Sequence, residues 1–263
     1  MKSTYSIFAA AALCSTLCAA AERYSLWPRR PAEIEQARQL LHERRAEEAA
    51  RLLLPLVDRE GIAGREARKL MGAANVPAYL SLRHPGAAVY TVRRGDHLAK
   101  ISAAVHCPYE LMMLLNGIVD PASVQVGQKL VYVPMRQRLE INLPRREISV
   151  WDGTVLVASY DLKATDSPGV GSGADEETAV TRRDGYVDGG RLPAWSPLMA
   201  CAERRLELAN GVVLAGDARA GGKVMVMRQA DLNELALLVA VGSPVNIVRG
   251  AADIPDAAPQ QPS

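Results

Sequence analysis

Histidine is scarce in this chain and stops early. The 263 residues include four histidines, and the last of them is His106. Everything after that position therefore lacks an imidazole. A Cys–His, Ser–His or His–metal mechanism needs an imidazole close to its partner, so the C-terminal half cannot build one from its own residues. This absence excludes a large group of enzyme mechanisms there.

An excess of charge of one sign is also missing. The chain has 31 Lys plus Arg against 29 Asp plus Glu, which gives a net charge of +2. Such a balance offers no electrostatic attraction for nucleic acid, and we predict no nucleic-acid partner. With 49% apolar and 23% charged residues, the composition is that of an ordinary globular protein. Its length allows one or two domains, or several small modules.

Long apolar runs are absent, and the longest apolar run in the sequence lies near its start. Lys2 is followed by an Ala-rich apolar run over residues 7–17, and small residues follow at 19–21. This pattern predicts a signal peptide over residues 1–21. An uncleaved anchor is disfavoured because the run is shorter than the roughly 18–20 residues that span a bilayer. A lipoprotein signal is disfavoured because Leu13 and Leu17 stand directly before Cys14 and Cys18.

Cysteine is rare once the signal peptide is removed. Only Cys107 and Cys201 are left, and an exported protein could join them in one disulfide. They belong to what we predict to be different modules. We therefore interpret both as small buried side chains with free thiols.

Residues 28–80 show helical spacing of apolar side chains. Ile34, Ala37, Leu40 and Leu41 form one run, and a second extends from Ala46 to Val57. The string "ARQLLHERRAEEAARLLLPLV" resembles a tetratricopeptide-type helical hairpin. A single hairpin cannot bury its apolar face alone, so we expect it to dock on another surface. Other cell-wall proteins are candidate partners of this region.

A linker is predicted by composition over residues 75–87. This stretch contains Pro77, Pro85 and Gly86, which interrupt regular structure. His84 falls within it, and we assign it no partner.

Residues 88–134 give the strongest pattern. A short strand over 89–92 precedes a tight turn at Gly95, and Asp96 is predicted to cap the helix that follows. A second helix begins near Pro108, and we expect its buried side to carry Leu111, Leu114 and Leu115. Turns at 116–117 and 120–121 lead to a closing strand over 129–133. The order is strand, helix, helix, strand.

Three strings in this block, "YTVRRGDHLAKI", "LLNG" and "VGQKLVYVP", resemble a LysM domain in order and spacing. The resemblance implies binding of N-acetylglucosamine glycans, here peptidoglycan. It also implies sugar contacts from the loop after the first strand and the loop after the second helix. The residues carried over are Gly95, Asp96, His97, Leu98, Asn116, Gly117, Ile118 and Val119.

This chain departs from the LysM pattern at His97, where most members have Ser or Thr. A hydroxyl contact to sugar would be missing there. His97, His106 and Cys107 could suggest a metal site, but a helix separates them, and we predict no metal and no cofactor.

Residues 137–249 are predicted to be mostly β. Apolar residues alternate over 139–143, a hairpin turn follows at Asp152-Gly153, and further strands fall at 205–208, 212–214 and 224–227. We interpret residues 165–195 as a loop, since Gly169, Gly171 and Gly173 lack the strand-to-helix context of a dinucleotide site. A helix over 232–239 and a strand over 245–248 close the block, and residues 250–263 are predicted to be a disordered tail.

The strings "LEINLPRREISVWDGTVLVASYDLKA" and "DLNELALLVAVGSPVNIV" resemble the first and last parts of a YkuD-type L,D-transpeptidase domain. That family carries a His-Gly pair and a Ser-x-Gly-Cys-x-Arg string. Here Ala215 takes the His position before Gly216, and Val224 and Val226 take the Cys and Arg positions. Gly221 and Lys223 take the Ser and Gly positions. We therefore predict no catalytic residue and a degenerate domain.

The sequence thus predicts a multi-domain α+β protein made of a short helical hairpin region, a βααβ LysM module and a mostly-β L,D-transpeptidase-like domain. We expect a non-enzymatic peptidoglycan-binding protein secreted across the inner membrane to the periplasm or cell wall. The alternative is an active L,D-transpeptidase that uses Cys201. An isolated thiol with a pKa of about 8.5 and no imidazole nearby is poorly activated, which favours the first.

Overall fold

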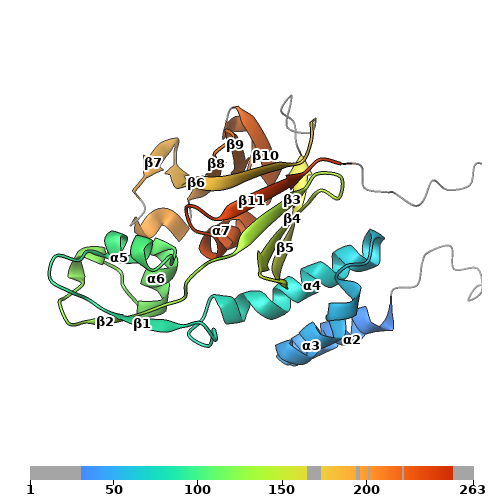
Figure 1. Ribbon diagram of the computed structural model, residues 1–263, viewed down its shortest axis with the longest axis horizontal. Helices are drawn as coiled ribbons and strands as arrows, with labels where there is room; N and C mark the ends of the chain where they lie inside the picture. The colour runs from blue at the N-terminus through green and yellow to red at the C-terminus, as the bar shows by residue number, and fades with distance from the viewer. Residues whose placement is uncertain (1–30, 165–172, 194–195, 201, 221, 251–263) are drawn as a thin grey trace, which may run out of the picture.

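The computed structural model describes residues 31–164, 173–193, 196–200, 202–220 and 222–250 (Figure 1). The predicted signal peptide, Cys201, Gly221 and almost all of the predicted tail lie outside these residues. In the part of the chain that is described, no helix is both long enough and apolar enough to cross a membrane.

The N-terminal part is helical. It consists of α2 (Ala32–His42), α3 (Ala46–Leu53), the 3-10 turn η1 (Leu54–Leu56) and α4 (Gly61–Tyr79). Apolar side chains at helical spacing, such as Ile34, Ala49 and Leu53, meet in one cluster that also includes Leu156 from a strand of the β domain. The helical region therefore shares its core with the β domain, which is the surface on which it docks.

The predicted linker over 75–87 is partly wrong. Helix α4 continues to Tyr79, with Pro77 inside its last turns. Pro77 removes a hydrogen bond to the carbonyl of Ala73, and Ala73 is exposed, so water can replace the missing donor. His84 also has partners: its Nδ1 accepts the Gly86 N–H at 2.9 Å, and its ring meets Tyr79 edge-on at 4.6 Å.

The LysM module has the predicted order of elements. Strand β1 (Ala88–Thr91) precedes α5 (Leu98–Ala104) and α6 (Tyr109–Asn116), and the 3-10 turn η2 (Pro121–Ser123) leads to β2 (Lys129–Tyr132). The two strands pair antiparallel. The predicted buried side of α6 is wrong at Leu114, which is 63% exposed, because this two-turn helix buries Tyr109, Leu111 and Met112 instead.

The β domain contains nine strands within the described residues. They are β3 (Arg138–Asn142), β4 (Glu147–Asp152), β5 (Val155–Ala164), β6 (Glu176–Val187), β7 (Gly190–Leu192), β8 (Glu203–Leu208), β9 (Val212–Ala215), β10 (Lys223–Met227) and β11 (Pro244–Val248). The pairing runs β11-β3-β4-β5-β10-β9-β8-β6, and β6 pairs with β11 again. Eight strands therefore form a closed circuit, and β7 extends it as a hairpin with β6. The 3-10 turns η3 (Pro197–Ala200) and η4 (Ala218–Ala220) lie between strands.

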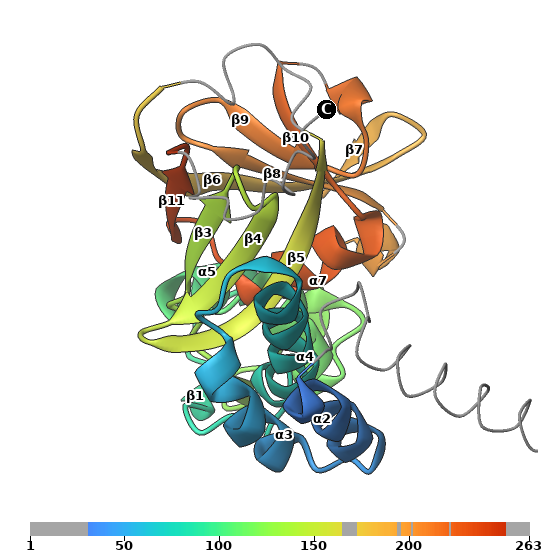
Figure 2. The ribbon, with the colours of Figure 1, turned by 90° about the vertical axis from the view of Figure 1, so that its right-hand side faces the viewer.

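The interior of this circuit holds the largest core. Inward residues such as Leu139, Ile148, Leu214 and Met225 contact one another there. Helix α7 (Gln229–Leu238) buries its apolar side in the same core (Figure 2). The β domain is thus a closed β structure to which one helix contributes.

The predicted loop over 165–195 is wrong for its second half, where β6 and β7 lie. Strand β6 carries "TRRD" at positions 181–184, so its apolar alternation is interrupted. These charges are paired across the strand surface: Arg182 contacts Asp184, and Arg183 contacts Glu110 of the LysM module. Pairing makes a charged segment compatible with a strand that has neighbours on both edges. Of Gly169, Gly171 and Gly173, only Gly173 lies within the described residues.

Candidate functional site

The first predicted glycan-contact loop is organised by Asp96. Its carboxylate accepts the Arg93 N–H at 2.9 Å and the Tyr90 hydroxyl at 2.8 Å, and Lys100 Nζ lies 3.5 Å away. The hydrogen bonds from Arg93 and Tyr90 hold the pKa of Asp96 below its usual range. Gly95, with φ of +83°, makes the turn. Asp96 therefore fixes the shape of the loop.

The predicted helix cap at Asp96 is wrong by one residue. His97 is the N-cap of α5, and its Nδ1 accepts the Lys100 N–H at 3.3 Å. A Ser or Thr hydroxyl can make the same capping bond, which explains how histidine is tolerated here. Leu98, the next predicted contact, is buried in the core of the module.

The second loop is held by Asn116. Its Nδ2 donates to the Met112 carbonyl at 2.8 Å and to the Val131 carbonyl at 2.7 Å. Its Oδ1 accepts the Val131 N–H at 2.7 Å. Both amide hydrogens are thus used within the protein, and the side chain joins α6 to β2. Gly117, with φ of +62°, ends the helix in the left-handed conformation.

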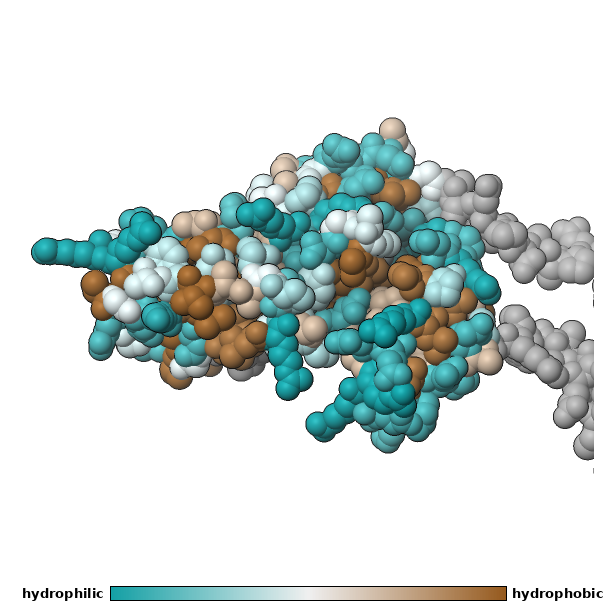
Figure 3. Space-filling view, turned by 60° about the horizontal axis from the view of Figure 1, so that its bottom comes forward, coloured by the Kyte–Doolittle hydropathy of each residue, from teal (hydrophilic) through white to brown (hydrophobic). Residues whose placement is uncertain are grey.

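The two loops offer different surfaces to a ligand: the first exposes Arg93, Arg94 and His97, whereas the second exposes an apolar side chain. Val119 is 79% exposed, and Ile118 is half-buried against the core. Figure 3 shows apolar side chains gathered on the LysM end of the molecule, at the left of the view. The two loops are connected through the β1–β2 pair. Strand β1 leads into the first loop, and Asn116 at the second loop bonds to β2, the strand that pairs with β1. Glycan contact at the eight residues stays a prediction.

His106 and Cys107 lie in the bend between α5 and α6. The Cys107 thiol is free and buried, and burial raises its pKa to about 11. His106 has a φ of +53°, and its carbonyl accepts the Met135 N–H at 2.8 Å. Within the described ranges, no three His, Cys, Asp or Glu side chains gather as a metal site would require. Both residues have structural roles in the bend.

The positions predicted from the sequence to replace the transpeptidase machinery lie on β9 and β10. These strands pair in parallel, with Ala215 opposite Val226 and Val213 opposite Val224. Ala215, Val224 and Val226 form a small buried apolar cluster. A cavity of about 230 Å³ next to it is lined by Arg204, Arg205, Gly216 and Asp217 among others. The cluster itself contains no nucleophile, acid or base.

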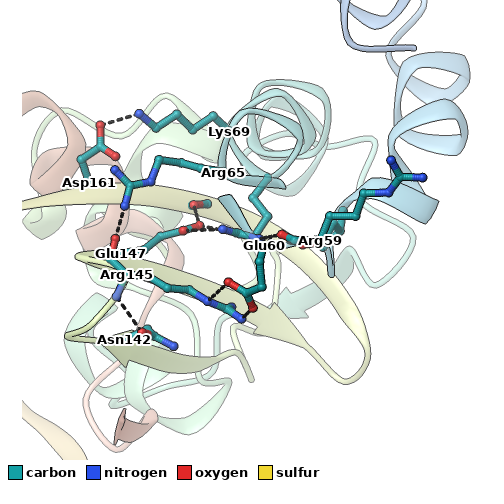
Figure 4. A network of polar contacts seen from close by, with 11 residues as sticks. Arg59, Glu60, Arg65, Lys69, Asn142, Arg145, Glu147 and Asp161 are labelled. Atoms are coloured by element: carbon teal, nitrogen blue, oxygen red, sulfur yellow. Dashed lines mark hydrogen bonds and ion pairs between the residues drawn. The ribbon is translucent and has the colours of Figure 1, made fainter. Parts of the chain in front are cut away.

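Two buried ion-pair networks, which the sequence analysis missed, join the modules to the β domain. In the first, Arg68 of α4 meets Glu147 of β4 through Nε–Oε1 at 2.6 Å and Nη2–Oε2 at 2.8 Å. Arg68 Nη1 donates to the Val57 carbonyl at 2.8 Å and the Arg59 carbonyl at 3.1 Å, and the Ser159 hydroxyl donates to Glu147. Figure 4 shows this network, with the Glu60–Arg145 and Lys69–Asp161 pairs near it.

The second network joins α6 to strands β6 and β8. Glu110 accepts Arg183 Nη2 at 2.9 Å and Arg204 Nη1 at 2.8 Å. Burial by itself would raise the pKa of Glu110, but the two guanidinium groups outweigh it and lower that pKa. The one sequence signal was an acidic residue within the apolar string "YELMMLL".

Comparison with known proteins identifies the middle module. Residues 90–132 match the family model described as LysM domain, so the chain contains a LysM domain. No curated protein matches the chain.

Part of the chain has a structural likeness to solved L,D-transpeptidases. An L,D-transpeptidase 1 from Mycobacterium tuberculosis has 10% identity and a TM-score of 0.31, over 46% of this chain and 66% of that one. An L,D-transpeptidase from Mycobacterium smegmatis has 11% identity and a TM-score of 0.29, over 47% and 64%. A mutant L,D-transpeptidase from Enterococcus faecium has 13% identity and a TM-score of 0.30, over 52% and 62%. The chain thus spans slightly under two thirds of each of these proteins.

Proposed function

We propose that this protein is exported to the periplasm or cell wall and binds peptidoglycan through its LysM domain, at N-acetylglucosamine. The observation that carries the proposal is the LysM match over residues 90–132. The exposed side chain of Val119 and the half-buried side chain of Ile118 support it, because apolar side chains beside the backbone of a turn suit N-acetyl groups. These two residues are the proposed glycan floor.

The β domain is proposed to be a non-catalytic scaffold. Acyl transfer by a thiol needs a thiolate, an acid for the leaving amine and donors for the oxyanion. The strand positions that we predict to replace that machinery carry Ala215, Val224 and Val226, which have no ionisable group. This part of the chain also has no histidine. The apolar cluster supports a structural role for these positions.

Peptidoglycan binding is tested by pull-down of the protein on insoluble peptidoglycan. Val119→Glu places a charge on the proposed glycan floor at an exposed position, so it should reduce the bound fraction several-fold without a change in stability. Ile62→Glu is the matched control, because Ile62 is also exposed but lies on α4. Equal binding by wild type and Val119→Glu would move the glycan site elsewhere. Asn116→Ala is unsuited to this test because it breaks the α6–β2 connection.

Catalytic inactivity is tested with a carbapenem, which acylates the nucleophile of active L,D-transpeptidases. Intact-protein mass spectrometry should show no adduct after exposure, and tetrapeptide-stem substrates should remain unlinked. A stoichiometric adduct that disappears in Cys201→Ser would establish the alternative, an active L,D-transpeptidase with Cys201 as its nucleophile.

A further inference from the structure

The first loop of the LysM module presents cations to solvent. Arg93, Arg94 and Lys100 are exposed there, and Asp96 is the one carboxylate within residues 93–100. The Asp96 side chain is only 8% exposed, whereas that of Lys100 is 62% exposed. Asp96 is also engaged, since it accepts the Arg93 N–H at 2.9 Å. The loop therefore offers positive charge to a ligand and keeps its carboxylate inside.

Arg93 is held in place, but its charge is not neutralised. Its guanidinium carbon lies 6.0 Å from the centroid of the Tyr90 ring, which is a cation–π geometry. The Tyr90 hydroxyl is fixed in turn by Asp96 at 2.8 Å. Within the described ranges, the guanidinium groups of Arg93 and Arg94 form no ion pair. The planar donor group of an arginine matches a carboxylate, and two of these groups are available here.

The start of the first loop lies beside the end of the second. The Val92 N–H donates to the Gln128 carbonyl at 2.9 Å, and the Val92 carbonyl accepts the Gly127 N–H at 2.8 Å. The two arginines directly follow Val92 in the chain. The second loop carries the opposite charge, the exposed Asp120, next to Val119. A charged ligand that spans both loops is therefore bound best with its anionic group at the first loop.

We propose that the LysM domain prefers N-acetylglucosamine glycans that carry carboxylates over neutral ones, an inference that rests on the proposed glycan binding. Ile118 and Val119 contact an N-acetyl group, and Arg93 and Arg94 bind the carboxylate. Peptidoglycan has two sources of this chemistry: the lactyl group of N-acetylmuramic acid in strands without peptide, and the stem peptide. Chitin has neither, so the two arginines discriminate between these glycans.

The test is isothermal titration calorimetry of the full exported chain with matched oligosaccharides. The probes are chitotetraose, the peptide-free tetrasaccharide of alternating N-acetylglucosamine and N-acetylmuramic acid, its methyl ester, and the same tetrasaccharide with stem peptides. We expect the free acid to bind about three- to ten-fold more tightly than the methyl ester at low salt, because each exposed arginine–carboxylate pair contributes modestly. High salt should reduce this difference, since it screens exposed charges. The tighter of the two acidic probes identifies the source of the carboxylate.

Three variants sharpen the test. Arg93→Gln combined with Arg94→Gln removes both guanidinium charges, so the free acid and the methyl ester should bind equally. Arg93→Lys combined with Arg94→Lys keeps the charge without the planar donor group and should retain part of the preference. Arg83→Gln removes an exposed cation that precedes β1, outside both loops, and should leave the preference unchanged. Equal thermal unfolding midpoints show that the variants keep their fold.

The outcomes separate this inference from the proposed function. If wild type binds chitotetraose but does not distinguish the acidic probes from the methyl ester, the inference is overturned and glycan binding stands. If no probe binds, the proposed function fails, and the inference fails with it. A preference that survives in the Arg93→Gln, Arg94→Gln variant, or that is lost in Arg83→Gln, also overturns the assignment to the first loop.

Discussion

The helical region and the LysM module are both joined to the β domain through buried arginine and glutamate, yet the two networks differ in composition. Arg68 and Glu147 form a one-to-one bidentate pair whose remaining groups meet two carbonyls and a hydroxyl. Glu110, by contrast, is shared by Arg183 and Arg204, each with an unpartnered Nε within the described residues.

This difference indicates how each module relates to the β domain. Around Arg68 the helical region and the strands share one apolar core, and Gly72 brings the backbone of α4 against β5. Around Glu110 the interface borders a ligand-sized cavity. The helical region is therefore an integral part of the β domain, whereas the LysM module is attached through an interface that is only partly filled.

The largest expected effect comes from Glu147→Ala, which would leave Arg68 as an uncompensated buried charge. We expect a loss of about 3–5 kcal/mol in the free energy of unfolding, measured by urea denaturation. Lys69→Ala is the control, because its pair with Asp161 is solvent-exposed and is worth at most about 1 kcal/mol. Similar losses in both variants would contradict a special role for the buried pair.

A smaller effect is expected for Glu110→Ala, which leaves two arginines without their shared carboxylate. We expect a loss of about 2–3 kcal/mol, because these hydrogen bonds involve charged groups but Arg183 keeps its bond to the Ala236 carbonyl. Trypsin should then cut more rapidly after Arg136, between the LysM module and β3. Glu207→Ala, which removes an exposed pair with Arg182, should leave that rate unchanged.

Gly72→Val tests the close approach of α4 to β5. A Cβ at this position would lie 3.3 Å from Ala158 Cα and from Ser159 N, so the helix must shift outward. We expect a loss of about 1–3 kcal/mol from overpacking, measured by thermal unfolding. Ala73→Val makes a similar change at the exposed neighbouring position. If both variants lose equally, helix propensity rather than contact with β5 is responsible.

The smallest effect on stability is expected from acidic pH. The folded-state pKa of Glu110 is below its ordinary value of 4.5. The ion pairs of Glu110 therefore fully stabilise the interface between the LysM module and the β domain above pH 4.5. That stabilisation is lost as the pH falls further, through the folded-state pKa. The difference in stability between wild type and Glu110→Gln should thus be constant from pH 7 to 4.5 and shrink below it. A difference that already declines near neutral pH would contradict this assignment.

The LysM domain was predictable because its signals are local. Gly95 and Gly117 have positive φ where the turns were expected, and the closing strand follows a third such glycine, Gly127. The errors were also local in origin. Asp96 was expected to cap α5, but Tyr90 and the Arg93 N–H compete for its carboxylate. Three leucines on a helix of only two turns did not determine which side is buried.

The attachment of the modules could not be predicted, because the partners lie far apart in sequence. Glu110 meets Arg183 and Arg204, which are 73 and 94 residues away, and Arg68 meets Glu147 over 79 residues. The strand β6 was missed for a related reason. Its charged residues indicated a loop, because the sequence does not show that Glu110 pairs with Arg183 and so allows Arg183 to be buried.

The position of β11 has a consequence for how the chain folds. Val245 lies opposite Leu139 of β3 in parallel register and opposite Thr178 of β6 in antiparallel register. The last strand within the described residues, β11, is therefore an interior member of the circuit, and β3 and β6 keep open edges until it pairs with them. Closing such a long loop is slow, and open edges invite pairing with other chains. The β domain can therefore complete its fold only after the chain has emerged through Val248.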